Sequence, residues 1–173
     1  MIAFAAMKLF LDTEFSESNL LRAELVSLAL VSENGRECYL ERDPLPEQCS
    51  AFVRANVYPL LDRETAAVVD VEFTRQVRAF LREIPEPFII ADFPGDQCFC
   101  EVALTGFQSP RSALADCGPM PAIRWRIEED PELADRIERW FAARPEARRH
   151  HALTDARALR ECWLAHRWRS PCW

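Results

Sequence analysis

Three short groups of side chains could do chemistry, and each lies where a predicted strand or helix begins or ends. The first is Asp12 and Glu14, which follow the apolar run at residues 9–11. Residues two apart on a strand point to the same face of a sheet, so the two carboxylates project together. Acids at the end of a buried strand are costly unless they are paired or bind a metal ion. The plainer alternative is a strand that ends there with two solvated acids.

The second group follows the apolar run at residues 88–91, which is typical of a buried parallel strand. Asp92 stands at the end of this strand, and Asp96 stands at the start of the next predicted helix. The carboxyl ends of strands are where α/β sheets bind ligands. The alternative for Asp96 is a helix N-cap, because short polar side chains favour that position and Pro-Gly turns attract aspartate.

The third group is the sequence HHALTDA at residues 150–156, in front of the last predicted helix. His150 precedes this helix, and Asp155 lies in its first turn. An ordinary helix start would also explain these residues, with Thr154 as the cap and Asp155 stabilised by the helix dipole. Each group therefore has a structural explanation of its own, but the occurrence of all three in this order favours a shared site.

The hydrophobic pattern predicts the elements that must position these groups. The predicted strands occupy residues 8–15, 24–32, 36–41, 88–91 and 122–127. The predicted helices occupy residues 47–61, 70–84, 96–104, 131–143 and 154–166. Pro59 should end or kink the first helix, and residues 105–121 have the composition of a loop. The order predicts an α/β fold: a mixed five-stranded sheet, an antiparallel meander first and parallel strands after it, with helices on both faces.

The length of 173 residues suits a single domain, residues 1–173. Residues 1–6 lack the positive charge of a signal peptide and are interpreted as a disordered or non-native lead-in, with Met7 as an alternative start. No apolar run approaches the roughly 20 residues that a bilayer requires, so no membrane partner is expected. Seven cysteines without zinc-type spacing favour reduced thiols and a cytoplasmic location.

The net charge of −7 argues against strong non-specific binding to a nucleic-acid backbone. The distribution is uneven, because acids dominate before Pro121 and arginines become frequent after it. A carboxylate cluster that holds divalent cations also inflates the formal negative charge, since bound ions are not counted. Charge alone therefore leaves a nucleic-acid substrate open.

Together, the motifs resemble those of the DEDDh 3′-5′ exonucleases of the RNase H-like superfamily, and most of all the small bacterial single-domain 3′-5′ exoribonucleases. The resemblance rests on FLDTEF at the first strand, an acid after a later strand, and His-x-Ala-Leu-x-Asp-Ala before the last helix. It covers essentially the whole chain. The second motif departs from the family pattern His-Asn-Ala-x-Phe-Asp, which places its Asn on Asp92, its aromatic residue on Gly95 and its acid on Asp96.

The resemblance implies an RNase H-like fold and a set of catalytic metal ligands: Asp12, Glu14, Asp96 and Asp155. Asp92 is the alternative to Asp96. The expected cofactors are two Mg²⁺ or Mn²⁺ ions, because such hard cations prefer oxygen ligands, and two ions can promote phosphodiester hydrolysis. His150 is the fifth catalytic residue implied, the base that takes a proton from the attacking water when neutral near pH 7. His151 falls on a variable position.

Phe15 and Phe93 are expected to bind substrate by stacking on the terminal base, with core packing as the alternative. Arg148 and Arg149 could hold a phosphate, although such arginines more often form a solvated surface. The tryptophans are expected to pack the last helices or an interface: Trp140, Trp163 and Trp168. The family often forms homodimers, and the aromatic C-terminus ending at Trp173 is the contact surface we would expect.

The expected partner is single-stranded RNA or a 3′ RNA overhang, which the protein would hydrolyse from the 3′ end. A DNA exonuclease is the first alternative, because nothing in the sequence shows a contact with a 2′-hydroxyl. A non-catalytic nucleic-acid-binding module on the same fold is the second, and a plain structural domain is the third. The intact set of four acids and a histidine weighs against the second, and the third requires that the plain structural explanation hold for all three motifs at once.

Overall fold

The computed structural model describes residues 6–167 of the chain. The strands are β1 (Lys8–Phe15), β2 (Leu25–Ser32), β3 (Glu37–Arg42), β4 (Ala67–Val68), β5 (Phe88–Ala91) and β6 (Arg124–Ile127). The α-helices are α1 (Ala51–Asn56), α2 (Asp70–Arg82), α3 (Pro94–Thr105), α4 (Pro131–Ala142) and α5 (Ala152–Arg167). Two 3-10 helices, η1 (Tyr58–Leu60) and η2 (Arg111–Cys117), lie in the connections.

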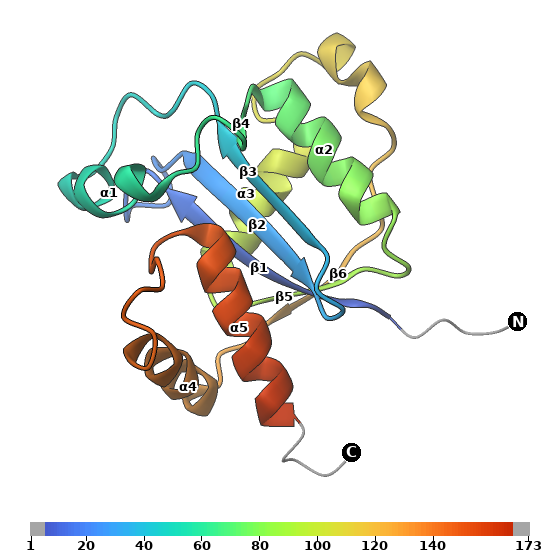
Figure 1. Ribbon diagram of the computed structural model, residues 1–173. Helices are drawn as coiled ribbons and strands as arrows, with labels where there is room; N and C mark the ends of the chain where they lie inside the picture. The colour runs from blue at the N-terminus through green and yellow to red at the C-terminus, as the bar shows by residue number, and fades with distance from the viewer. Residues whose placement is uncertain (1–5, 168–173) are drawn as a thin grey trace, which may run out of the picture.

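The strands form one mixed sheet in the order β4-β3-β2-β1-β5-β6 (Figure 1). The first three strands pair as an antiparallel meander, while β5 is parallel to β1 and β6 is parallel to β5. The carboxyl ends of β1 and β5 therefore meet at one edge of the sheet. This arrangement confirms the predicted α/β class with its antiparallel and parallel parts.

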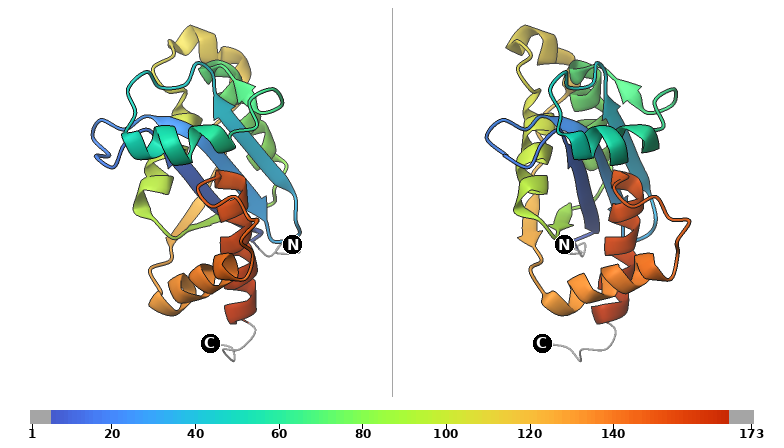
Figure 2. Two further views of the ribbon diagram at one scale, coloured as in Figure 1. Left: turned by 60° about the vertical axis from the view of Figure 1, so that its left-hand side comes forward. Right: turned by 90° about the vertical axis from the view of Figure 1, so that its left-hand side faces the viewer.

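Helices cover both faces of the sheet, and the two faces differ in what they carry. Helix α5 contacts β1 and β2 on one face, whereas α2 and α3 contact the sheet from the other (Figures 1 and 2). Alternation along β1 sends Leu9 and Leu11 into the core shared with α2 and α3. The intervening Phe10 packs against α5, where its ring meets Trp163 edge-on at 5.5 Å. Asp12 and Glu14 continue the Phe10 side of the strand.

A bulge interrupts the pairing of β1 and β2 where β1 ends. Glu14 is paired with Ser27 but Phe15 is paired with Leu25, so Val26 has no residue opposite it. A bulge of this kind bends a strand and increases its twist. The end of β1 is thereby turned at the residues that carry the acids.

The structure differs from the sequence prediction in three connections. Residues 47–61 do not form one helix: α1 is six residues long, and the chain continues as η1, whose second residue is Pro59. The sheet has six strands rather than five, because the two-residue β4 joins its edge. The region 105–121 was predicted to be loop but includes η2. A two-residue strand and a 3-10 turn are too short to leave a periodic signal.

Two predicted helices begin earlier than expected. Helix α3 starts at Pro94 rather than Asp96, with proline in the first turn, where its missing N–H costs nothing. Helix α5 starts at Ala152 rather than Thr154. Asp96 therefore lies inside the first turn of its helix instead of at the boundary, and Asp155 stays in the first turn, as predicted.

The tryptophan predictions are settled only in part. Trp163 is buried against Phe10, and Trp140 packs beside it while its indole N–H donates to Glu161 at 2.6 Å. Trp168 and the expected contact surface at Trp173 lie outside the described residues. Within residues 6–167, no helix combines the length and apolar character that a bilayer span requires.

Candidate active site

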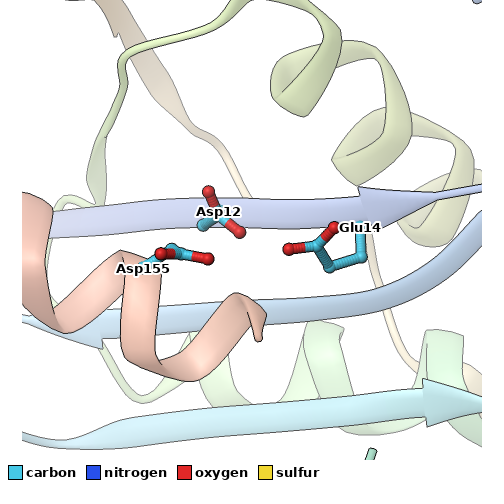
Figure 3. A group of neighbouring side chains, drawn as sticks. All are labelled: Asp12, Glu14 and Asp155. Atoms are coloured by element: carbon cyan, nitrogen blue, oxygen red, sulfur yellow. The ribbon is translucent and has the colours of Figure 1, made fainter. Parts of the chain in front are cut away.

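Two carboxylates from β1 and one from α5 converge beside the sheet. Asp12, Glu14 and Asp155 each offer an oxygen, and these oxygens all lie within 4.8 Å of one another (Figure 3). The spacing of two residues on β1 aims the first two at α5, and the first turn of α5 supplies the third. The side chains come from positions more than 140 residues apart in sequence, yet they share one small volume.

A second group of oxygens shares Asp12 with the first. Asp12, Asp92 and Asp96 also offer oxygens that lie within 4.8 Å of one another. Asp96 is buried, whereas Asp92 is exposed at the end of β5. The geometry therefore does not choose between Asp92 and Asp96 as the acid of the second motif, because both face Asp12.

Asp96 is held by the residue between the two acids of β1. One oxygen of its carboxylate accepts from the Thr13 amide at 3.1 Å and from the Thr13 hydroxyl at 2.7 Å. The N-cap of α3 is Phe93, so the interpretation of Asp96 as a helix cap is wrong. Thr13, on the opposite face of β1 from Asp12 and Glu14, thus fixes the orientation of Asp96, which α3 brings to the strand.

Asp155 is fixed in a similar way by the loop before its helix. Its Oδ2 accepts from the backbone N–H of His150 at 2.8 Å. Thr154 lies inside the first turn, and its own N–H donates to the His151 carbonyl, so the expected Thr154 cap is absent. The bond between residues 150 and 155 ties the histidine directly to an acid of the cluster.

The carboxylates raise one another's proton affinity. Burial raises the pKa of Glu14 to about 8, and repulsion from Asp155 and Asp96 adds to it. Burial likewise raises the pKa of Asp96 to about 7 and that of Asp155 to about 7, although hydrogen bonds to both carboxylates oppose the shift. The pKa of Asp12 rises too, first through burial and then through its acidic neighbours. Without a cation, this site cannot hold all of its negative charge at neutral pH.

These residues fit a metal centre. Among the described residues, Asp12 Oδ2 is buried without a hydrogen-bond partner, and an acceptor of this kind is costly unless something binds it. The donor set is oxygen only, which suits hard divalent cations such as Mg²⁺ and Mn²⁺. Asp12 belongs to both groups of oxygens.

His150 stands at the rim of the same cavity in an unusual backbone conformation. Its φ is +67°, in the left-handed region that few residues other than glycine adopt without strain. Its ring meets that of Phe52, from α1, edge-on with the centroids 5.0 Å apart. Burial, followed by the charge of Arg149, lowers the pKa of the imidazole, so the neutral form dominates at pH 7.

The site forms a cavity of about 380 Å³ that mixes acids with aromatic side chains. Phe15 stacks on Phe99 with the ring centroids 5.0 Å apart and on Phe93 at 6.1 Å, so Phe15 both packs and lines the cavity. Phe93 is 42% exposed, so part of its ring remains accessible. It folds over Gly95, where an added Cβ would lie 2.3 Å from the Phe93 ring.

The two arginines before His150 separate into different roles. Arg148 pairs with Asp62 at 2.6 Å and donates to the Leu60 carbonyl, away from the cavity lining. Arg149 lines the cavity. Among the described residues that line it, five are acids and Arg149 is the arginine. It also pairs with the exposed Glu138 at 2.6 Å. Arg149 is therefore the one of the two that faces the site.

No protein family and no curated protein matches the sequence. Solved structures do match. The zinc-bound form of the Escherichia coli exonuclease I complex with single-stranded DNA superposes with a TM-score of 0.62 at 13% identity, over 97% of this chain and 42% of that one. A second exonuclease I structure gives 0.61 at 15% identity over 96% of this chain, and exonuclease I from Methylocaldum szegediense gives 0.61 at 16% over 96%.

The chain has an RNase H-like exonuclease fold. It spans about two fifths of the length of these exonucleases, 42%, 42% and 41% respectively. Identities this low carry the architecture and not the substrate.

The motifs do not point to several residues that shape the site. Thr13 lies between two acids and is given no role by the first motif, yet its hydroxyl, on the opposite face of the strand, is what orients Asp96. Phe52 and Asp62 come from a segment without any motif and reach the His150 loop only through the fold. His151, expected on a variable position, is fully buried. Only its adjacency to His150 was visible in the sequence.

Proposed function

We propose that this protein is a metal-dependent 3′-5′ exonuclease that hydrolyses phosphodiester bonds, with RNA as its substrate. The observation that supports this most is the sharing of Asp12 between two groups of carboxylate oxygens, each within 4.8 Å. Such an arrangement suits two divalent ions held side by side. The exonuclease fold supports the same reaction class.

The acids would divide the work of holding the two ions. Asp12 would bridge them, Glu14 and Asp155 would complete one position, and Asp96 with Asp92 beside it would support the other. When bound, Mg²⁺ or Mn²⁺ would activate the attacking water and neutralise the charge that develops on the phosphate and the leaving oxygen. Thr13 keeps Asp96 turned to this task through its two hydrogen bonds.

His150 would act as the general base. Its lowered pKa leaves the imidazole neutral at pH 7, which is the form that can accept a proton. The His150 amide is committed to Asp155 and the ring is free to face the cavity, which it lines. Phe15 and Phe93 would place the terminal base, with Phe93 offering its exposed face for stacking.

The substrate sugar is the open choice within this proposal. The motif FLDTEF and the spacing of the last motif resemble exoribonucleases, which favours RNA. One structurally similar protein is described as a complex with single-stranded DNA, and that observation makes DNA the second candidate. The expected substrate is a single strand or a 3′ overhang in both cases, because a cavity lined by acids and aromatic rings suits an unpaired terminal nucleotide.

A single assay tests reaction and substrate together. The purified protein is incubated with 5′-labelled RNA and DNA oligonucleotides of one sequence, in Mg²⁺, in Mn²⁺ and in chelator. We expect a ladder that shortens from the 3′ end, requires the metal, and forms faster on RNA. Asp12→Asn should remove the ladder while circular dichroism stays unchanged.

Each other outcome has a definite meaning. A faster ladder on DNA would keep the exonuclease and reject RNA as its substrate. Binding of oligonucleotide without cleavage in any metal would reject the enzyme and support a binding module. If the protein neither binds nor cleaves any oligonucleotide, the nucleic-acid proposal is rejected altogether.

A further inference from the structure

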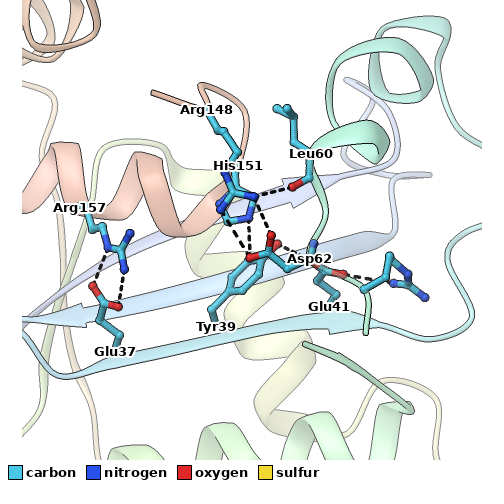
Figure 4. Close-up of polar contacts among 9 residues, drawn as sticks. Glu37, Tyr39, Glu41, Leu60, Asp62, Arg148, His151 and Arg157 are labelled. Atoms are coloured by element: carbon cyan, nitrogen blue, oxygen red, sulfur yellow. Dashed lines mark hydrogen bonds and ion pairs between the residues drawn. The ribbon is translucent and has the colours of Figure 1, made fainter. Parts of the chain in front are cut away.

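His151, next to the proposed base, is fully buried and stands in an unusual environment (Figure 4). Its ring lies against that of Tyr39 on β3, with the centroids 4.6 Å apart. Within the described part of the chain, neither ring nitrogen has a hydrogen-bond partner. A carboxylate oxygen of Asp62, Oδ2, lies 3.5 Å from Nε2 of the ring.

Asp62 contacts both sides of His150. Arg148, two residues before the histidine, donates to Asp62 Oδ1 at 2.6 Å and to the Leu60 carbonyl at 3.1 Å. His151, the residue after it, places its ring nitrogen against the other oxygen of the same carboxylate. The hydrogen bond from Arg148 holds the pKa of Asp62 below its usual range, so this carboxylate is charged. The side chain of Asp62 thus contacts the chain on either side of His150. We call its contacts with Arg148 and His151 the clasp.

Asp62 is itself anchored to the sheet. Its backbone N–H donates to Glu41 Oε1 at 2.6 Å, and Glu41 is a fully buried residue of β3. The same oxygen of Glu41 accepts from the Tyr39 hydroxyl at 2.6 Å. A continuous path therefore runs from β3 through Asp62 to Arg148 and His151, one on each side of His150 (Figure 4).

The conformation of His150 makes this support necessary. A φ of +67° stores strain that persists only where surrounding contacts fix the chain. The loop 143–151 between α4 and α5 is long, and without a clasp the histidine could relax to an ordinary backbone conformation. Its bond to Asp155 is one restraint, and the Asp62 contacts are the other.

We propose that Asp62 is a positioning residue, which holds the proposed base His150 in place by binding Arg148 and His151 on its two sides. Asp62 does not touch the cavity, so it acts on the reaction only through His150. This inference rests on the proposed function for its kinetic part. Its structural part, the clasp, can be measured on its own.

The geometry predicts the kind of defect that loss of Asp62 causes. A misplacement of about 1 Å in a catalytic group can cost on the order of 100-fold in rate. Asp62→Ala should therefore lower kcat by about 10- to 100-fold and leave KM within about threefold, since the aromatic contacts to the substrate are untouched. Asp62→Asn keeps the shape and one acceptor for Arg148, and it should lose less.

Glu37→Ala is the matched control. Glu37 on β3 pairs with Arg157 on α5 at 2.6 Å, and the exposed fractions of the partners are close to those of the Asp62–Arg148 pair, which joins two loops (Figure 4). This variant removes an ion pair of the same kind that does not involve the His150 loop. It should leave kcat unchanged, so a loss seen only in the Asp62 variants is not a general effect of removing an ion pair of this exposure.

Two further measurements separate positioning from a merely structural role. In the His150→Ala background, Asp62→Ala should add no further loss of kcat, because the group that it positions is gone. In the otherwise native protein with Mg²⁺, the backbone amide of His150 should exchange its hydrogen about tenfold faster or more in Asp62→Ala, and at the native rate in Glu37→Ala.

The hydrogen exchange does not require activity, so failure of the two proposals can be told apart. If the native protein hydrolyses nothing but the His150 amide loses protection only in the Asp62 variants, the clasp stands and the exonuclease falls. Unchanged exchange in both Asp62 variants overturns the clasp, whatever the activity. An additive loss of kcat in the double variant overturns it as well.

Discussion

The crowded carboxylates should make the metal-free protein lose stability as the pH rises. The pKa of Glu14 is raised from 4.5 to about 8, so the folded chain holds this proton more tightly than the unfolded chain does. The folded state therefore binds more protons than the unfolded state between these values. Under that condition the free energy of unfolding falls with increasing pH, from about 4.5 upward, and levels off above about 8.

The size of the effect follows from the same two values. Each tenfold change in proton affinity is worth about 1.4 kcal/mol, so the charged Glu14 alone would cost roughly 5 kcal/mol in the folded state. Asp12, Asp96 and Asp155 share the repulsion, and relief at one site relaxes the others. We therefore expect Glu14→Gln to raise the metal-free stability at pH 8 by about 2–4 kcal/mol, against a total of about 5–15 kcal/mol for a domain.

Urea unfolding in chelator, followed by fluorescence between pH 6.5 and 8.5, measures this directly. The range starts at 6.5 because the pKa values of His150 and His151 are lowered from 6.5, which destabilises the protein at lower pH and would oppose the carboxylate effect. Glu64→Gln is the control, since Glu64 is an exposed acid away from the cluster. Its profile should follow that of the native protein.

Added Mg²⁺ sharpens the test. It should stabilise the native protein at pH 8 by about 2.7 kcal/mol at a hundred times its dissociation constant, and it should do far less for Glu14→Gln. A flat profile for the native protein in chelator would refute the reasoning. So would a Glu14→Gln variant that is less stable than the native protein at pH 8.

Four further outcomes are expected at the site. Asp12→Asn should lower kcat in the ladder assay by more than about 100-fold, since even outer partners of a metal site are worth 10–100-fold. His150→Ala should lower kcat by about 100- to 10,000-fold with little change in KM, measured by initial rates on a short oligonucleotide. Phe93→Ala should raise KM about 5- to 150-fold, the equivalent of one lost stacking contact, in the same assay. Thr13→Val should weaken Mn²⁺ binding about tenfold or more by titration calorimetry, because Asp96 loses its hydroxyl donor.

Each of these expectations can fail separately. Native kcat in Asp12→Asn would remove the shared ligand from the proposal, and native kcat in His150→Ala would remove the base. If Phe93→Ala changes the unfolding free energy but not KM, its ring packs rather than binds. Equal Mn²⁺ affinity in Thr13→Val would mean that the Thr13 amide alone orients Asp96, through the bond at 3.1 Å.

The sequence predicts most of the site because its residues sit at regular positions. The alternation of β1 puts Asp12 and Glu14 on one face, and the antiparallel meander follows from the pairing of strands that are consecutive in the sequence. The predicted start of a helix is wrong where the helix begins without a capping side chain. Neither α3 nor α5 starts at the polar residue that the pattern favours, because Pro94 opens the first and the His150–Asp155 bond fixes the start of the second.

What the sequence does not predict is held together by contacts between distant segments. Asp62 lies 86 residues from Arg148, and nothing near it in the chain has the form of a motif. The role of Gly95 is also visible only in space. The aromatic residue expected at that position is missing, and the ring of Phe93, two residues earlier, lies over the glycine instead.

The alternation of β1 ties two requirements to a single strand. Deleting one residue upstream of Asp12 would turn Asp12 and Glu14 toward the apolar helices α2 and α3 and bring Leu11 out to the cavity, since every side chain would change sides together. Such a one-residue shift of the strand register would damage folding and catalysis together. Strand β1 therefore cannot change its register by one residue without losing both.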